Sequence, residues 1–228
     1  MSRGWLIVFA KAPRPGLVKT RMSPPLSLDQ AAELYEAMLA DSLDASLRFA
    51  KALDLLPVVA FYPLDAAGEF IGRAPAGFRL QAQRGSDLAD RMANAFAEAA
   101  AAGADRILLR GSDSPALERS LFEMAMNQLD AGDDVVFTPD QSGGYAMIGM
   151  RTPHPALFDL AMSTEEVMEQ TVLIADSLGL RSSMTAPGFD LDTVGDFHCL
   201  DALSSAQLSD LCPRTVKSIS SLAIDDVL

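Results

Sequence analysis

The chain has 228 residues, 49% of them hydrophobic, and a formal net charge of −13 at pH 7. This apolar content is enough for a sizeable core and excludes a disordered chain. The negative charge disfavours nucleic acid and anionic membrane surfaces as partners, because phosphate groups repel it.

Cys199 and Cys212 lack a metal-binding spacing and are expected to be reduced thiols. The first apolar run is too short for a secretion signal or a membrane span, so we expect a cytoplasmic protein without membrane insertion.

Apolar runs alternate with helix signals along almost the whole chain. Residues 5–10 form a continuous apolar run, as in a strand covered on both faces, and Ser27–Gln30 is typical of a capping box that opens a helix reaching about residue 50. Further strands are expected at 56–62, 78–83, 106–110, 134–138, 145–150 and 181–186. Further helices are expected at 86–102 and 117–129, from a cap at 163–166 to about 179, and from Thr193, the last clear one. This alternation predicts an α/β fold with a mostly parallel sheet flanked by helices.

No repeat, low-complexity tract or linker interrupts the sequence, so we expect a single domain over residues 1–228. Its core is expected at about 4–205, with a C-terminal tail at about 206–228. The apolar residues of this tail favour a short helix that docks on the body or on another subunit.

The loop after the first strand concentrates positive charge in an otherwise acidic chain. It carries four of the eighteen lysines and arginines. Backbone-shaping residues separate these cations, and the residues of interest are Lys11, Pro13, Arg14, Gly16, Lys19, Thr20 and Arg21. Such a loop can bind phosphate oxygens. A solvated basic surface loop remains the alternative, and the Walker A pattern is absent.

Two carboxylate-bearing segments follow later strands. Gly111–Pro115 includes Ser112 and Asp113, and a second segment carries Asp190 and Asp192. Mg²⁺ takes one or two protein carboxylates and completes its shell with phosphate oxygens and water, so both segments are candidate metal sites. Helix capping is the alternative for each. The second segment also fits the haloacid-dehalogenase motif, which is rejected because too little chain follows it.

The segment joining the two successive strands before residue 150 is a candidate sugar or acceptor pocket. Its Gly-Gly pair would let the backbone approach a ligand closely, and its tyrosine could stack on a ligand or hydrogen-bond to it. The candidate residues are Asp140, Ser142, Gly143, Gly144 and Tyr145. A hairpin turn with a half-buried tyrosine is the alternative.

Seven motifs in this order resemble a known family. They are FAKAPRPGLVKTRM, QRGSDLADRM, GSDSP, SGGYAMIGM, PHPALF, ST and DLDT, and they span about residues 5–200. The chain resembles bacterial glycosyltransferase-like proteins, also called radical-SAM/selenodomain-associated transferase 1, of the nucleotide-diphospho-sugar transferase superfamily. Residues 19–21 and the following helix also look like the 2-phospholactate guanylyltransferases. The resemblance implies a GT-A type of α/β fold.

The resemblance also implies roles for single residues. Lys11, Lys19 and Arg21 would contact nucleotide phosphates, with Pro13, Gly16, Thr20, Asp87 and Ser112 beside them and Arg91 near Asp87. Asp113 would hold the metal together with Asp192 and Asp190, and Lys19 and Asp113 would be the catalytic residues. The family usually has aspartate where this chain has Ser142. The role of that aspartate would be lost here unless Asp140 substitutes for it.

These inferences predict a transferase that uses a nucleotide sugar or a nucleoside triphosphate, Mg²⁺ or Mn²⁺, and a small-molecule acceptor. Glycosyl and nucleotidyl transfer both remain open. The alternative is a non-catalytic nucleotide-binding protein with a degenerate site, which the serine at position 142 favours. A second copy of the chain is a candidate partner.

Overall fold

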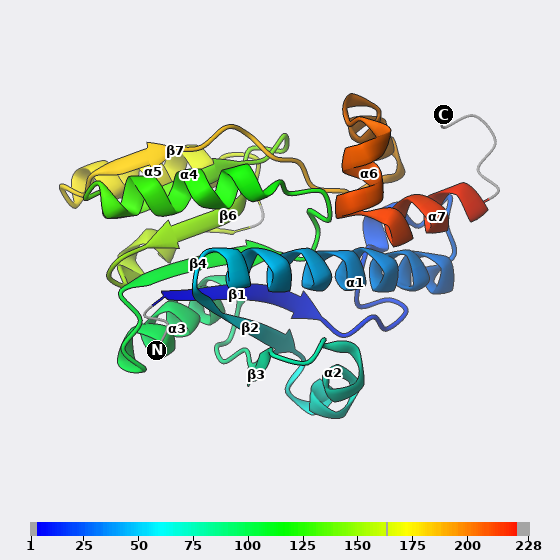
Figure 1. The fold of residues 1–228 in the computed structure, drawn as a ribbon, viewed down its shortest axis with the longest axis horizontal. Helices are drawn as coiled ribbons and strands as arrows, with labels where there is room; N and C mark the ends of the chain where they lie inside the picture. Colours follow the sequence, from blue (N-terminus) through cyan, green and yellow to red (C-terminus); the bar gives the residue numbers. More distant parts are fainter. Residues whose placement is uncertain (1–3, 163, 223–228) are drawn as a thin grey trace.

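A seven-stranded sheet forms the centre of the molecule (Figure 1). The computed structural model describes residues 4–162 and 164–222. The strands lie in the order β3-β2-β1-β4-β6-β5-β7, and within these ranges β6 alone runs antiparallel to its neighbours. Their bounds are Gly4–Lys11 (β1), Leu55–Tyr62 (β2), Arg79–Ala82 (β3), Arg106–Gly111 (β4), Val135–Pro139 (β5), Tyr145–Met150 (β6) and Ser182–Met184 (β7). The predicted α/β class with a mostly parallel sheet is confirmed.

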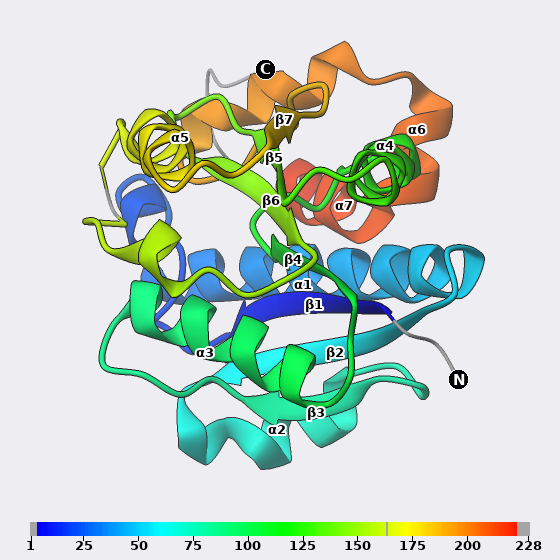
Figure 2. The same cartoon turned by 90° about the vertical axis from the view of Figure 1, so that its left-hand side faces the viewer.

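Helices cover both faces of this sheet (Figure 2). One face packs against α1, α2 and α4, and the other packs against α3 and α5. The helix bounds are Leu28–Ala52 (α1), Ala67–Arg73 (α2), Leu88–Ala101 (α3), Arg119–Asp130 (α4), Val167–Ser177 (α5), Ser205–Leu211 (α6) and Pro213–Ser221 (α7). Short 3₁₀ helices lie at Thr20–Met22 (η1), Leu64–Ala66 (η2), Pro155–Phe158 (η3) and Val194–Ala202 (η4). None of the described helices is both long and apolar enough to cross a membrane.

The N-terminus of α1 follows the sequence prediction closely. The Ser27 hydroxyl accepts from the Gln30 backbone N–H at 3.1 Å, and the Gln30 side chain accepts from the Ser27 N–H at 2.9 Å. The predicted capping box is therefore confirmed. The predicted cap at 163–166 is not confirmed. Helix α5 begins at Val167, and the Glu166 side chain does not cap it. Ser163 lies outside the described residues.

The C-terminal part differs from the prediction. Thr193 opens η4 rather than an α-helix, and α6 and α7 follow it. Figure 1 shows α7 beside α1, where the Asp41 carboxylate accepts from the Thr215 N–H at 2.8 Å and pairs with Arg214 at 3.0 Å. Asp41 is fully buried, so this contact fixes the described part of the tail to the body. Residues 223–228, at the end of the predicted tail, lie outside the described ranges.

The sheet topology determines where a site can form. Strands β1, β4 and β5 all point the same way, so the loops that follow them leave the same edge of the sheet. In open α/β sheets, this carboxyl edge is where ligands bind.

Candidate active site

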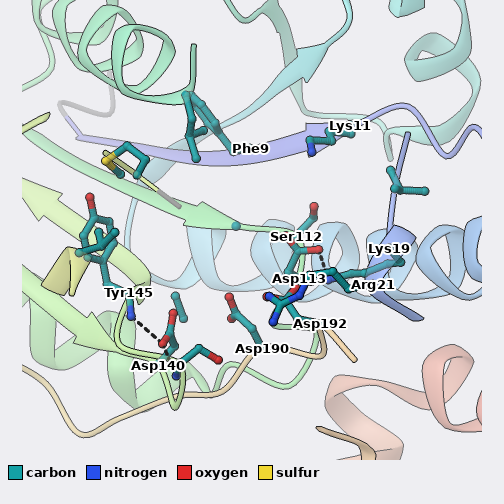
Figure 3. A pocket seen from close by; sticks show the side chains of 18 of the residues that line it. Phe9, Lys11, Lys19, Arg21, Ser112, Asp113, Asp140, Tyr145, Asp190 and Asp192 are labelled. Atoms are coloured by element: carbon teal, nitrogen blue, oxygen red, sulfur yellow. Dashed lines mark hydrogen bonds and ion pairs between the residues drawn. The ribbon is translucent and has the colours of Figure 1, made fainter. Parts of the chain in front are cut away.

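A cavity of about 1140 Å³ lies at the carboxyl edge of the sheet. Its walls come from the loop after β1, the turn after β4, the β5–β6 loop, α3 and the 190–192 segment. In Figure 3, Asp113, Asp190 and Asp192 lie together, with Lys19 and Arg21 on one side and Asp140 and Tyr145 on the other. We call Lys19, Arg21, Asp113, Asp190 and Asp192 the cation–carboxylate cluster.

Lys19 is at the centre of this cluster. Its backbone has the left-handed conformation, with φ of 47°, where the loop turns into η1. The Lys19 ammonium contacts Asp113 and lies 2.8 Å from an Asp192 oxygen, and its side chain is only 4% exposed. Burial disfavours the charged amine, but the charges of Asp113 and Asp192 outweigh it and raise the pKa of Lys19. Lys19 therefore stays charged and neutralises carboxylates from two distant segments.

The other residues of the basic loop divide between the cavity and the outer surface. Lys11, Thr20 and Arg21 line the cavity, and Arg21 is 71% exposed and 3.6 Å from Asp192. Arg14 turns away and bonds to Glu69 at 2.9 Å, so it does not face the phosphate position suggested for it. Pro13 and Gly16 also lie outside the cavity lining. The loop is thus partly a wall of the site and partly a surface contact with α2.

The turn after β4 presents Asp113 to the cavity. The capping alternative for this turn is wrong, because α4 begins at Arg119 and Glu118 occupies its N-cap. Ser112 lines the cavity beside Asp113 but is buried and shares a 2.7 Å hydrogen bond with the Tyr35 hydroxyl. Asp113 does not cap α4, and its carboxylate pairs with the Lys19 ammonium instead.

The 190–192 segment brings in two more carboxylates. The Leu191 N–H donates to the Asp113 carbonyl at 2.9 Å, which ties this segment to the β4 turn. Asp190 accepts a hydrogen bond from the Ser114 hydroxyl. Burial, together with the nearby charge of Asp113, raises the pKa of Asp190 to about 7. A charged Asp190 is therefore repelled by Asp113. The capping alternative holds for Thr193, which caps η4, and leaves the Asp192 carboxylate with Lys19.

The β5–β6 loop, residues 140–144, is a hairpin turn and also a wall of the cavity. Asp140 accepts from the Ser142 and Gly144 N–H groups at 2.6 and 2.9 Å. Ser142 is exposed. Gly143 approaches the backbone of Glu165, where a Cβ would collide, and not an open ligand position. Asp140 and Gly143 thus shape the loop through contacts within the protein.

The ring of Tyr145 lines the cavity, whereas its hydroxyl group is enclosed by the protein. The ring is half-buried, packs against Phe137 at 5.7 Å between centroids and lines the cavity. The hydroxyl is enclosed, and this burial raises the pKa of Tyr145. Stacking on a ligand remains a prediction, whereas the enclosed hydroxyl is unsuited to bonding one.

The segment before α3 contributes less to the cavity than expected. Asp87 caps α3 by accepting from the Asp90 N–H at 2.9 Å and does not line the cavity. Arg91 does line it, with its guanidinium 4.3 Å from the Tyr62 ring centroid. Gln83 also lines it, although its side-chain amide bonds to the Ala60 carbonyl.

Sequence reasoning missed the polar residues that support the cluster from behind, which are Tyr35, Ser42, Arg110 and Ser114. A signal was present for two of them. Tyr35 and Ser42 share the apolar stripe of the predicted first helix, and a serine on such a stripe needs a hydrogen-bond partner.

Comparisons with known proteins agree with this architecture. A family model described as "Uncharacterized protein conserved in bacteria (DUF2064)" matches residues 46–164, just over half of the chain. The chain belongs to the DUF2064 family. No curated protein matches it.

Solved structures show the same fold. The Desulfovibrio desulfuricans G20 protein named "putative nucleotide-diphospho-sugar transferase" is 29% identical with a TM-score of 0.81, covering 96% of this chain and 99% of that one. A Leptospira borgpetersenii cytidylyltransferase has a TM-score of 0.55 at 11% identity, covering 98% and 99%. A CMP:2-keto-3-deoxy-manno-octonic acid synthetase complexed with CTP has a TM-score of 0.54 at 11% identity, covering 96% and 100%. The last two likenesses concern the fold alone.

Proposed function

We propose that this protein is a divalent-cation-dependent transferase that takes a nucleotide sugar or a nucleoside triphosphate as donor and a small molecule as acceptor. The observation that carries the proposal is the cation–carboxylate cluster, in which Lys19, Asp113 and Asp192 come together in one large cavity. The names of the similar structures, a nucleotide-diphospho-sugar transferase and two cytidine-nucleotide enzymes, support the same class of donor.

The donor set of the cluster fits Mg²⁺ or Mn²⁺. Within residues 4–162 and 164–222, no group of three or more acidic, histidine or cysteine side chains is arranged to hold a metal ion by itself. One or two carboxylates suffice for Mg²⁺ when phosphate oxygens and water complete its shell. Asp113 with Asp190 or Asp192 would supply them, and a cation between Asp113 and Asp190 would relieve the repulsion of these two carboxylates. The bound ion would neutralise charge that develops on the phosphate groups.

The residues of the β1 loop would hold the phosphates. Arg21 and Lys11 are exposed cations at the cavity wall, and Lys19 lies deeper with its charge fixed. Fixed positive charges aimed at the phosphates stabilise the transition state, because they need no reorganisation during the reaction. Arg91, Gln83 and the Tyr145 ring also line the cavity, and this lining beyond the cluster is available to the remainder of the donor and to the acceptor. The acceptor oxygen can attack directly, so no covalent enzyme intermediate is required.

Product analysis with labelled GTP, CTP and UDP-glucose tests this proposal and separates its two chemistries. Release of pyrophosphate indicates nucleotidyl transfer, and release of a nucleoside diphosphate indicates glycosyl transfer. Each should need Mg²⁺ or Mn²⁺. No turnover of any donor across a broad set of acceptors would contradict the proposal.

The second candidate is a nucleotide-binding protein without turnover. Two observations favour it: Ser142 has no carboxylate, and Asp140 is already engaged by the backbone of its own loop. Thermal stabilisation by nucleotides separates the two candidates. Binding that ignores both Mg²⁺ and an Asp113→Asn substitution would support the non-catalytic protein.

A further inference from the structure

A positively charged side chain lies wholly inside the protein behind the carboxylates. Arg110, near the end of β4, has an exposed fraction of 0%. Its guanidinium packs 5.9 Å from the centroid of the Phe122 ring, on the face of the sheet covered by α1 and α4. Burial of a charge is costly unless it is matched by hydrogen bonds and opposite charge. This cost indicates that Arg110 has a role that an apolar residue could not fill.

The hydrogen bonds of Arg110 go to the turn that carries Asp113. Its Nε donates to the Gly111 carbonyl at 2.9 Å, and its Nη2 donates to the Ser114 carbonyl. Nη2 also lies 3.3 Å from the hydroxyl of Ser42, which donates to the Ser112 carbonyl at 3.2 Å. The planar guanidinium thus spans both ends of the turn, a geometry that lysine cannot reproduce.

The remaining carbonyl of the turn, that of Asp113, accepts from the Leu191 N–H. All four consecutive carbonyls from Gly111 to Ser114 therefore have a donor. Ser114, which Arg110 holds through its carbonyl, directs its hydroxyl to the Asp190 carboxylate. Arg110 is connected in this way to both aspartates without touching either.

We propose that Arg110 is a positioning residue that fixes the relative placement of Asp113 and Asp190 for a divalent cation. This inference rests on the proposed function and goes beyond it, because it assigns the geometry of the cation site to a residue outside the cavity. The opposing charges of Asp190 and Asp113 keep the buried guanidinium charged, although burial lowers the pKa of Arg110 to about 10.

The experiment compares Mn²⁺ affinity between charge-matched variants by electron paramagnetic resonance of free Mn²⁺. Arg110→Lys keeps the positive charge and loses the two-ended contact, so its Mn²⁺ dissociation constant should rise about tenfold or more, as expected when supports behind metal ligands are lost. Arg214→Lys is the control, since the Arg214 guanidinium also pairs with a buried carboxylate, that of Asp41, but lies on α7 beside α1 and does not line the cavity. Its Mn²⁺ affinity should equal that of the wild type even if its melting temperature falls.

A second variant keeps the inference testable if Arg110→Lys does not fold. Ser114→Ala removes the hydroxyl bond to Asp190 without changing any charge, and should also weaken Mn²⁺ binding. Unchanged Mn²⁺ affinity in Arg110→Lys, or in Ser114→Ala where that is the only folded variant, would overturn the role of Arg110. A wild-type protein that binds no Mn²⁺, either alone or with added GTP, CTP or UDP-glucose, would overturn the proposed function itself, and the role of Arg110 with it.

Discussion

The two ends of the cavity are built in different ways. At one end, the cation–carboxylate cluster joins residues that are far apart in the sequence, and the Lys19 ammonium bonds to two carboxylates from separate segments. At the other end, bonds from the Ser142 and Gly144 N–H groups to Asp140 shape the β5–β6 loop. The Gln141 side chain ties this loop to the cluster through two hydrogen bonds with the Asp190 backbone. A network between distant segments fixes a charge arrangement before a ligand arrives. The exposed Ser142 side chain takes no part in these bonds of the β5–β6 loop, so position 142 can change without disturbing them.

This difference suggests why Ser142 can stand where the resembling family has aspartate. The residue is exposed at the tip of a loop whose shape depends on Asp140 and the glycines. We therefore expect the steps that need charge to depend on the cluster and to tolerate change in the loop.

The largest effect is expected for Asp113→Asn. The amide keeps the size of the side chain but removes the negative charge that would hold the cation, so the transfer rate should fall about 100-fold or more. Steady-state rates with the active donor measure this loss. The comparison between the two ends of the cavity fails if Asp140→Asn, the matched change in the loop, costs as much.

Lys19→Met should separate cation binding from nucleotide binding. The variant loses a charge-assisted contact to phosphate, so nucleotide affinity should fall about tenfold. Mn²⁺ affinity should stay the same or increase, because Asp113 and Asp192 lose their nearest positive charge. Calorimetric titration with each ligand tests both statements.

Lys11→Met, which removes an exposed charge from the same loop, should have a smaller effect on nucleotide affinity because solvent screens it. Equal losses of nucleotide affinity in the two lysine variants would contradict the larger role proposed for Lys19.

Ser142→Asp tests the other end of the cavity. Since the account places the charge-dependent steps in the cluster, the added carboxylate should change the rate by less than about threefold, a difference under ~1 kcal/mol. Initial rates of the variant and the wild type, measured in parallel, give the answer. A gain of activity from an inactive wild type would instead show that the serine had disabled the site.

The smallest effect on function is expected for Asp87→Ala. This residue caps α3 and lies outside the cavity lining, so its loss should cost about 1 kcal/mol of folding stability and leave nucleotide affinity unchanged. Chemical unfolding and nucleotide titration measure the two quantities. A clear loss of affinity would place Asp87 in the site, as the sequence resemblance suggested.

The sequence predicted the parts of the molecule that depend on local pattern. The buried run of β1 and the capping box at Ser27 need no knowledge of the fold. The convergence of Lys19, Asp113 and Asp192 followed from one topological rule, that polar segments after parallel strands meet at the same edge. These residues share one cavity in the structure, although their chemical roles remain proposals.

The parts that sequence could not give depend on long-range contacts. Arg14 belongs to the same basic loop as Lys19, yet it turns to Glu69 on α2, a choice that no local pattern records. Arg110 ends an apolar run and looks like the end of a strand, whereas its function comes from a turn and a helix packed around it. The enclosed hydroxyl of Tyr145 likewise depends on what packs above the sheet.

Calorimetric titration of the wild type and Asp113→Asn with GTP, CTP and UDP-glucose, with and without Mg²⁺, shows whether the cluster binds a nucleotide together with a divalent cation. We expect that at least one of these nucleotides binds, and that its affinity falls about tenfold or more without Mg²⁺ or without the Asp113 carboxylate. Nucleotide binding that is indifferent to both, or no binding of any of the three, would contradict this expectation.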